Sequence, residues 1–323
     1  MKNNALRGFR PDGWQTVAMA LTLMSGTAIA GEAQGDGRPG TPDGWQFRLT
    51  PQFTYLPYHG ETTRDESTNY GVTFDAERPE RYGVTLALSH MRLDMRSGLP
   101  ALDQDTGFAS GRVHFTSSWF PGRMTVRLDG YSVSSNDATH ETDDVDTIAL
   151  QLAHLNTSRS LYVDLGYAAS GYGDSRIGNG DLTVQQWTPT LGFALNDGAD
   201  WMQARLYDVR VSNARRAMQH SGTDAVELKW THYFPSGNDW LPGSTQLGGL
   251  LGQRIYGVDW DTAVLFNLAD TQQGGVMAGA QWRLGSNLDW LLSAGVDRYT
   301  TQVTGPTTHY TANHLFTGVT LRW

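Results

Sequence analysis

The chain lacks cysteine: none of its 323 residues is one. This absence excludes disulfide bonds and thiolate metal sites, so stability must come from the fold itself. The sequence also lacks a glycine-rich phosphate-binding loop and a cysteine–histidine cluster. We therefore expect no cofactor and no metal centre, and no motif marks a catalytic residue.

Long apolar runs are missing as well. After residue 30 no run approaches the roughly 18 residues that a membrane-spanning helix needs, and the mean hydropathy is −0.42. If the chain spans a membrane, it must do so as a β-barrel, the other structure that pairs every backbone group. Basic residues are in deficit, with 24 Lys and Arg against 33 Asp and Glu and a net charge of −9. A nucleic-acid partner is therefore not expected.

The first 30 residues are typical of an export signal. Lys2, Arg7 and Arg10 form a basic start, a short apolar run follows, and Ala28-Ile29-Ala30 gives a small-x-small cleavage pattern. Residues 31–44 are rich in Gly, Pro and Asp and have no periodicity. We expect a signal peptide over 1–30, a flexible periplasmic leader over 31–44, and a transmembrane β-barrel over 45–323.

Strict alternation begins at Trp45. Apolar residues occupy every second position from Trp45 to Tyr55, with Arg48 and other polar residues between them. A period of two indicates a strand with one apolar and one polar face, and eleven such residues match a tilted strand that crosses a membrane. The pattern recurs along the whole chain. Further strands are expected near 70–76, 84–88, 113–119, 124–128, 148–152, 161–167, 187–193, 202–206, 226–230, 255–268, 276–284, 290–296 and 315–323.

These segments predict an all-β, antiparallel, up-and-down barrel of about fourteen strands, with twelve as the alternative. The connections favour a barrel over a sandwich, because tight turns such as 120–123, 156–159, 196–199 and 285–287 alternate with longer polar stretches. The longer stretches are 97–106, 135–143, 173–180, 213–222 and 302–311. Short turns at one end and long loops at the other are typical of outer-membrane barrels.

The last strand carries the most specific signal. Leu315, Val319, Leu321 and Trp323 share one face, and the chain ends on the aromatic Trp323. This stretch resembles the closing strand of Gram-negative outer-membrane β-barrel proteins of the porin type; no narrower family is indicated. The resemblance implies a bacterial outer-membrane location, with lipid and lipopolysaccharide as surroundings. It also implies that the barrel-assembly machinery reads an insertion signal made by Phe316, Leu321 and Trp323.

In a barrel the polar faces of the strands line the lumen. The charged residues expected there are Arg48, Arg112, His114, Arg127, Asp129, Asp164, Arg205, Glu227, Lys229, Arg283 and Asp297. Fourteen strands enclose more space than side chains alone fill, so a pore is expected. The strands and connections use almost all residues after 30, so no separate plug domain fits. Any narrowing of the pore must therefore come from a loop that folds into it. Residues 58–69 and 97–106 are the candidates. We expect a passive pore for the diffusion or export of small hydrophilic solutes.

Two alternatives stay open. A closed barrel could be an outer-membrane hydrolase acting on lipid or lipopolysaccharide, with a histidine base near the outer rim, or it could anchor a partner in surface export. His140, Glu141, Asp143 and Asp144 lie together in a long loop, where carboxylates can also bridge divalent cations to lipopolysaccharide phosphates. No nucleophile is marked beside them. The oligomeric state and the solute are left open.

Overall fold

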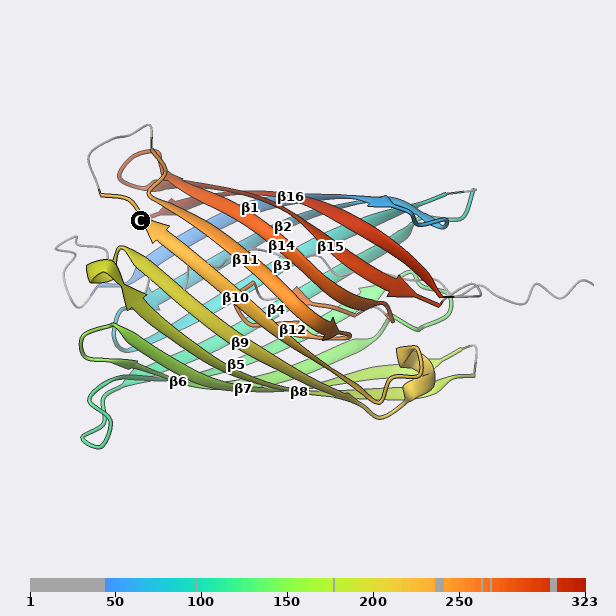
Figure 1. Cartoon of the computed structure of the whole chain (residues 1–323), viewed down its shortest axis with the longest axis horizontal. Helices are drawn as coiled ribbons and strands as arrows, with labels where there is room; N and C mark the ends of the chain where they lie inside the picture. The colour runs from blue at the N-terminus through green and yellow to red at the C-terminus, as the bar shows by residue number, and fades with distance from the viewer. Residues whose placement is uncertain are drawn as a thin grey trace, which may run out of the picture.

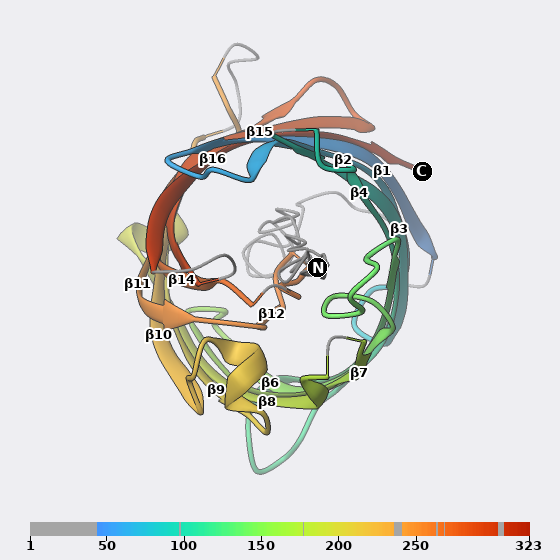
Figure 2. The same cartoon turned by 90° about the vertical axis from the view of Figure 1, so that its right-hand side faces the viewer.

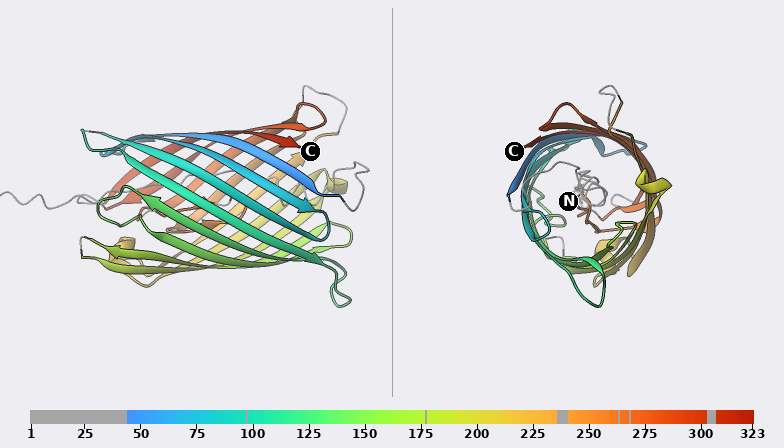
Figure 3. Two further views of the ribbon diagram at one scale, coloured as in Figure 1. Left: turned by 180° about the vertical axis from the view of Figure 1, so that it is seen from behind. Right: turned by 90° about the vertical axis from the view of Figure 1, so that its left-hand side faces the viewer.

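The barrel is closed by pairing of the first and last strands. In the computed structural model, which describes residues 44–96, 98–176, 178–235, 241–262, 264–267, 269–302 and 307–323, fourteen antiparallel strands form one ring. The strands cross the barrel wall obliquely in both side views (Figure 1, Figure 3). The predicted all-β class and the count of fourteen strands are confirmed, and the twelve-stranded alternative is wrong.

Each strand of the ring lies beside its neighbours in sequence, as in an up-and-down barrel. The strands are β1 (Gln46–His59), β2 (Arg64–Arg78), β3 (Tyr82–Met95), β4 (Leu102–Phe115), β5 (Gly122–Ser135), β6 (Val145–Asn156), β7 (Leu161–Ser175), β8 (Gly180–Leu195), β9 (Asp200–Val211), β10 (Gly222–Tyr233), β11 (Ser244–Arg254), β14 (Thr271–Arg283), β15 (Leu288–Thr301) and β16 (Thr308–Arg322).

Closure joins the two ends of the described chain. Arg48 pairs with Arg322 and Tyr58 with Ala312 in one continuous register. At the start of β1, the Phe47 N–H donates to the carbonyl of Trp323, the residue after β16, at 3.1 Å, and the Trp323 N–H donates to the Phe47 carbonyl at 3.2 Å. A closed ring has no unpaired edge, which is the condition for placing strands in hydrocarbon.

The two faces of the wall have opposite character. Outward side chains such as Leu88, Ile148 and Val276 are 67%, 66% and 60% exposed, whereas their neighbours on the inner face are mostly buried. Aromatic rings gather at the end of the barrel that holds Trp323, where Phe47 stacks on Trp323 and Trp282 stacks on Trp290. An apolar outer belt with an aromatic rim is the surface expected of a barrel in lipid.

The connections differ between the two ends. The end near Trp323, called the turn end here, has connections at 79–81, 116–121, 157–160, 196–199, 234–243 and 284–287. The opposite end, called the loop end, has connections at 60–63, 96–101, 136–144, 176–179, 212–221, 255–270 and 302–307. The predicted difference in connection length between the two ends is only partly confirmed. At the loop end the connections 60–63 and 176–179 are short, and at the turn end the connection 234–243 is long.

One connection turns into the barrel. Residues 255–270, called the infolded segment here, leave β11, form the short pair β12 (Val258–Asp259) and β13 (Val264–Leu265), and return to β14. Figure 2 shows β12 inside the ring. The expectation of a single strand over 255–268 is wrong: the wall strand is β11, which is rich in Gly and Leu. The alternating apolar residues of the segment do not share one face of this hairpin, because Val258 pairs with Leu265 and Val264 pairs with Asp259.

The two segments expected to narrow the lumen belong to the wall instead. Residues 58–69 contain the end of β1, a four-residue connection at 60–63 and the start of β2. Residues 97–106 hold the end of a short connection and the start of β4. Both predictions are wrong, since polar composition marks a connection but not the direction in which it folds.

The described ranges contain only two short 3₁₀ turns, η1 (Asn196–Gly198) and η2 (Ala214–Ala217), and no helix there is long and apolar enough to cross a membrane. The expected signal peptide, and the leader up to residue 43, lie outside the described residues.

The outer belt predicts a large difference between neighbouring substitutions on β3. Leu88→Arg places a charge on the exposed apolar face and should lower the free energy of unfolding by about 2–4 kcal/mol. Ser89→Arg is the matched control, because Ser89 is the register partner of Gly71 on β2 and faces inward, so its charge would enter the lumen and not the lipid. Denaturant titration of the barrel in lipid vesicles measures both. Equal losses would contradict the assignment of the two faces.

Candidate functional site: the lumen and its infolded segment

The infolded segment has a defined local structure. Val258 pairs with Leu265 and Asp259 with Val264, and the Phe266 N–H donates to the Gly257 carbonyl at 2.7 Å. At the tip, the Asp259 carboxylate accepts the Asp261 N–H at 2.9 Å. A side chain that caps its own turn in this way fixes the tip without help from the wall.

A buried carboxylate fastens the tip to the wall. Asp261 accepts from Arg205 of β9 at 2.7 Å and from Lys229 of β10 at 2.6 Å, and Gln203 adds a weaker contact at 3.4 Å. Burial alone would raise the pKa of the Asp261 carboxyl, but Arg205 and Lys229 outweigh it and hold this pKa well below its ordinary value. A paired and hydrogen-bonded charge is stable in such a place, whereas an unpaired one is not.

The backbone of the segment is also bound. Gln186 of β8 accepts the Val258 N–H at 2.8 Å and donates to its carbonyl at 2.7 Å. From β5, Arg127 donates to the Trp260 carbonyl at 3.1 Å. The Trp260 ring lies against Gly166 of β7, where a Cβ atom would come within 2.8 Å of the ring. Glycine at 166 therefore provides the space for this tryptophan.

Further contacts reach the remaining wall. Asp270 accepts from Arg64 of β2 and from Tyr310 of β16, both at 2.5 Å. Asn267 donates to Gln104 of β4 at 2.8 Å. Val264 and Phe266 share an apolar cluster with Phe316 of β16. The segment is thus held from many sides of the ring and narrows the lumen.

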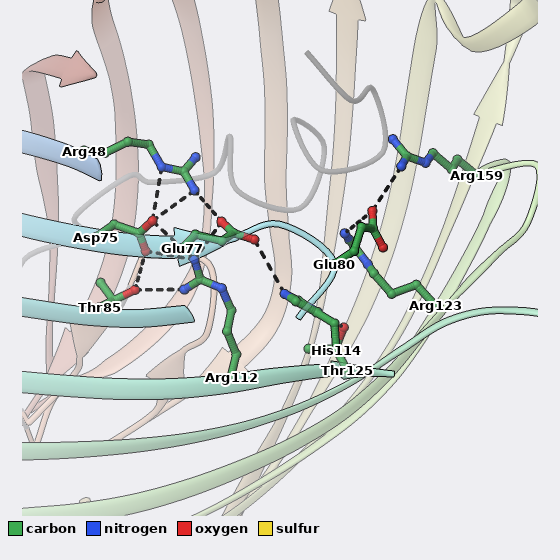
Figure 4. A network of polar contacts seen from close by, with 10 residues as sticks. All are labelled: Arg48, Asp75, Glu77, Glu80, Thr85, Arg112, His114, Arg123, Thr125 and Arg159. Carbon is green, nitrogen blue, oxygen red and sulfur yellow. Dashed lines mark hydrogen bonds and ion pairs between the residues drawn. The ribbon is translucent and has the colours of Figure 1, made fainter. Parts of the chain in front are cut away.

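A second set of charges lies at the turn end on the inner face of β1, β2 and β4 (Figure 4). Asp75 and Glu77 lie between Arg48 and Arg112, with nitrogen–oxygen distances of 2.8–3.0 Å. His114 lies 3.5 Å from Glu77 and contacts Thr125 at 2.9 Å. This network presents both signs of charge at the mouth of the lumen.

The eleven charged residues expected in the lumen fall into distinct groups. Arg48, Arg112 and His114 form the turn-end network. Four contact the infolded segment or its anchors, namely Arg127, Arg205, Glu227 and Lys229. Asp129 pairs with Arg127, Asp164 is buried, Asp297 pairs with His314, and Arg283 lies half-exposed at the turn end near Asp289.

Several acidic residues that pair with the predicted lumen cations were not predicted from the sequence. Asp75 and Glu77 lie on β2, where the position of the strand was left open. Asp259 and Asp261 lie in the segment taken for a wall strand. The sequence Asp259-Trp260-Asp261 carries no signal against a wall strand, because a polar residue on either side of an apolar one is also the pattern of a barrel strand with a polar lumen face.

The acidic loop at 136–144 divides into two parts. His140, Asp143 and Asp144 bring one possible ligand atom each within 4.8 Å of the others. Glu141 is used differently, since it pairs with the buried Arg216 at 3.2 Å and accepts from Asn179 at 3.1 Å. The geometry thus separates Glu141 from the other three, and cation bridging by this loop stays a prediction.

The residues expected to form the assembly signal point in opposite directions. Leu321 and Trp323 are on the outer face and 43% and 60% exposed, whereas Phe316 is 1% exposed on the inner face. Only Leu321 and Trp323 are therefore placed where a partner outside the barrel could contact them.

A closed antiparallel barrel with an apolar belt outside and ion pairs inside has the architecture of outer-membrane β-barrel proteins. The solved structures that resemble it agree on the fold. The Pseudomonas putida toluene transporter TodX matches with a TM-score of 0.50 and 11% identity, covering 97% of this chain and 98% of that one. A TodX deltaS2S3 mutant, a monoaromatic hydrocarbon channel, matches with a TM-score of 0.50 and 10% identity over 87% and 91%. No model of a protein family matches the chain, and no curated protein does.

The Asp261 anchor predicts a specific loss of stability. Asp261→Asn removes the negative charge between Arg205 and Lys229 and should cost about 3 kcal/mol, with faster amide exchange in the infolded segment. Asp224→Asn is the matched control, because Asp224 pairs with Arg210 on the exposed side of β10 and should cost less than about 1 kcal/mol. Denaturant titration and hydrogen exchange measure the two effects. Similar losses in both variants would refute the anchor.

The depressed pKa of Asp261 also predicts the response to acid. A carboxyl with a lowered folded-state pKa stabilises fully above its unfolded pKa, about 3.9, and loses this effect only as the pH falls through the lowered value. Amide protection in residues 258–262, corrected for intrinsic exchange, should therefore be the same at pH 7 and pH 4.5. Release of the segment within that window would contradict the ion pairing described here.

Proposed function

We propose that the protein is a passive outer-membrane channel for small water-soluble molecules, in which the infolded segment sets the size limit. The observation that carries this proposal is the segment itself, held across a lumen whose wall is lined by charged and polar side chains. The barrel fold that it shares with the transporter TodX supports a channel. The solute of TodX is not carried over, because the likeness is one of fold.

Polar atoms on the inner face support a hydrated path. Gln52 Nε2 and Asn69 Oδ1 are buried and make no hydrogen bond with any residue that the structure describes. In a dry core each such atom would cost roughly 1–3 kcal/mol. Wall residues of this kind therefore favour water and polar solutes inside the barrel.

The location and partners belong to the same proposal. An export signal over residues 1–30 would bring the chain to the periplasm, and Leu321 and Trp323 would offer the assembly machinery an outward contact. Lipopolysaccharide would surround the loop end, with His140, Asp143 and Asp144 able to share a divalent cation with its phosphates. A hydrolase finds less support, because Glu141 is held by Arg216 and Asn179.

Removing the infolded segment tests the channel directly. Gly257 and Phe266 already face each other across a backbone hydrogen bond, so Asn-Gly can replace residues 258–265 as a two-residue turn. In planar bilayers the wild type should show small, stable conductance steps, and the shortened protein should show steps at least about twofold larger, since a wider lumen conducts more ions. Heat-modifiable electrophoretic mobility verifies the fold. Unchanged conductance would exclude the segment as the constriction.

The turn-end network predicts ion selectivity. Arg48 is its more exposed cation, with 37% of the side chain accessible against 12% for Arg112. Arg48→Gln leaves Asp75 and Glu77 with less positive charge at the mouth and should shift the reversal potential in a salt gradient toward cation preference. Arg210→Gln, which changes an exposed cation paired with Asp208 and Asp224, should not shift it. A shift of equal size in both variants would argue against the network as a filter.

A further inference from the structure

Three residues form a row across neighbouring strands on the outer face, near the loop end. His59 of β1 is the register partner of Thr311 of β16, and Thr311 is in turn the partner of Arg298 of β15. Residues paired in this way point to the same side of the sheet, with Cβ atoms about 4.5–5.5 Å apart. His309 lies two residues from Thr311 on the same face, and its ring contacts the Thr300 hydroxyl at 3.1 Å. The outer basic patch, as it is called here, consists of His59, Arg298, His309 and Thr311.

The outer basic patch is accessible and lies just beyond the apolar belt. Arg298, His59 and His309 are all exposed. Val296 is the outward residue two positions before Arg298 on β15, so the arginine lies about 7 Å beyond the apolar side chains of that strand. Outside its hydrocarbon core a bilayer has a polar headgroup layer of roughly 5–8 Å on each side. The outer basic patch therefore lies where lipid headgroups meet the wall.

Arg298 is not neutralised by a neighbour. It makes no hydrogen bond or ion pair with any residue that the structure describes. Two other arginines lie on the outer face of wall strands toward the loop end, and both are paired. Arg92 of β3 contacts Asp94 at 3.0 Å, and Arg210 of β9 contacts Asp208 at 3.0 Å. A free guanidinium is therefore a feature of this position and not of every outward arginine in the wall.

The carboxylates near the outer basic patch are directed elsewhere. Asp297, the residue before the arginine, is on the inner face and pairs with a histidine there. Glu66 of β2 accepts from Tyr55 at 2.5 Å, and Glu61 is 5% exposed and accepts N–H groups of its own turn. The connection 302–307, which follows β15, contains no acidic residue. The patch is thus a local site of positive charge on an acidic protein.

The chemistry of the outer basic patch selects a ligand. A guanidinium offers five N–H donors in a planar fork that matches a phosphate group, and these charge-assisted hydrogen bonds are stronger than neutral ones. The two imidazoles and the Thr311 hydroxyl beside it add further donors. Because the patch lies at headgroup level, a phosphate carried by a lipid is held against it by the membrane itself.

We propose that the outer basic patch binds a phosphate group of lipopolysaccharide directly, with Arg298 as the main contact. This inference goes beyond the channel, and it rests on the outer-membrane location and on the placing of the loop end among lipopolysaccharide under the proposed function. It differs from bridging at His140, Asp143 and Asp144, because a guanidinium binds phosphate without a divalent cation.

Equilibrium binding tests the site. Fluorescence anisotropy measures the dissociation constant of labelled lipopolysaccharide for the refolded full-length protein in detergent, with EDTA present to remove divalent cations. Arg298→Gln should bind about fivefold more weakly, a change of about 1 kcal/mol, since an exposed pair of charges contributes up to this much. Arg210→Gln is the matched control and should leave binding unchanged. It removes the same charge from the same face, but from an arginine that Asp208 and Asp224 already hold.

Two further probes identify the ligand. Lipopolysaccharide from which the lipid phosphates have been removed should bind the wild type and Arg298→Gln alike, and millimolar inorganic phosphate should not displace the intact lipid. Equal binding of intact lipopolysaccharide by the wild type and Arg298→Gln would overturn the proposal, and so would equal weakening in Arg298→Gln and Arg210→Gln. A fivefold effect that persists without the lipid phosphates, or displacement by inorganic phosphate, would overturn the lipid phosphate as the ligand.

Conductance separates this site from the channel. Arg298 faces away from the lumen, so Arg298→Gln should conduct as the wild type does. A conducting protein whose affinity for lipopolysaccharide does not depend on Arg298 would overturn the site and leave the pore standing. A protein that binds lipopolysaccharide through Arg298 but never conducts would overturn the pore and leave the site standing.

Discussion

The structure depends on the backbone hydrogen bonds that join β1 to β16. A strand in hydrocarbon cannot leave N–H and C=O groups unpaired, and a ring is the arrangement of strands in which none has a free edge. Here the pairing of β1 with β16 ends in two hydrogen bonds between Phe47, near the start of β1, and Trp323, the residue after β16. Closure also creates an interior shielded from lipid, and the ion pairs around Asp261 and Asp75 are possible only because that interior exists.

The interior is divided by chemistry along its length. At the turn end the inner face carries the ion pairs of Asp75 and Glu77. Toward the loop end, Leu56, Tyr58 and Leu93 form a buried apolar cluster, and the Arg64–Asp270 pair lies beside Tyr58. The infolded segment takes part in both kinds of packing, since it carries Asp261 as well as Val264 and Phe266.

Much of this fold could be predicted from sequence, because the period of two is imposed by the wall itself. The strand around Leu150 and the closing strand at Leu321 follow from alternation alone. Two kinds of information were beyond that pattern. Alternation cannot separate a wall strand from a small hairpin packed inside the barrel, so 255–268 was misassigned and β11 was overlooked. Nor does it show pairing between distant residues, such as Arg205 and Asp261, which lie 56 residues apart. Phe316 illustrates a third limit, since the resemblance grouped it with Leu321 and Trp323 in the assembly signal, whereas its side chain is buried on the inner face.

The contacts between the infolded segment and the wall determine the order in which the barrel folds. Its contacts come from Arg64 on β2, Arg127 on β5, Lys229 on β10 and Tyr310 on β16, which are near one another only in the finished ring. The segment can dock fully only after the barrel has closed. Its interactions are therefore absent from the transition state for barrel closure. Interactions of this kind mainly raise the free-energy barrier to unfolding of the barrel. The infolded segment, which narrows the lumen, would thus also slow the unfolding of the barrel.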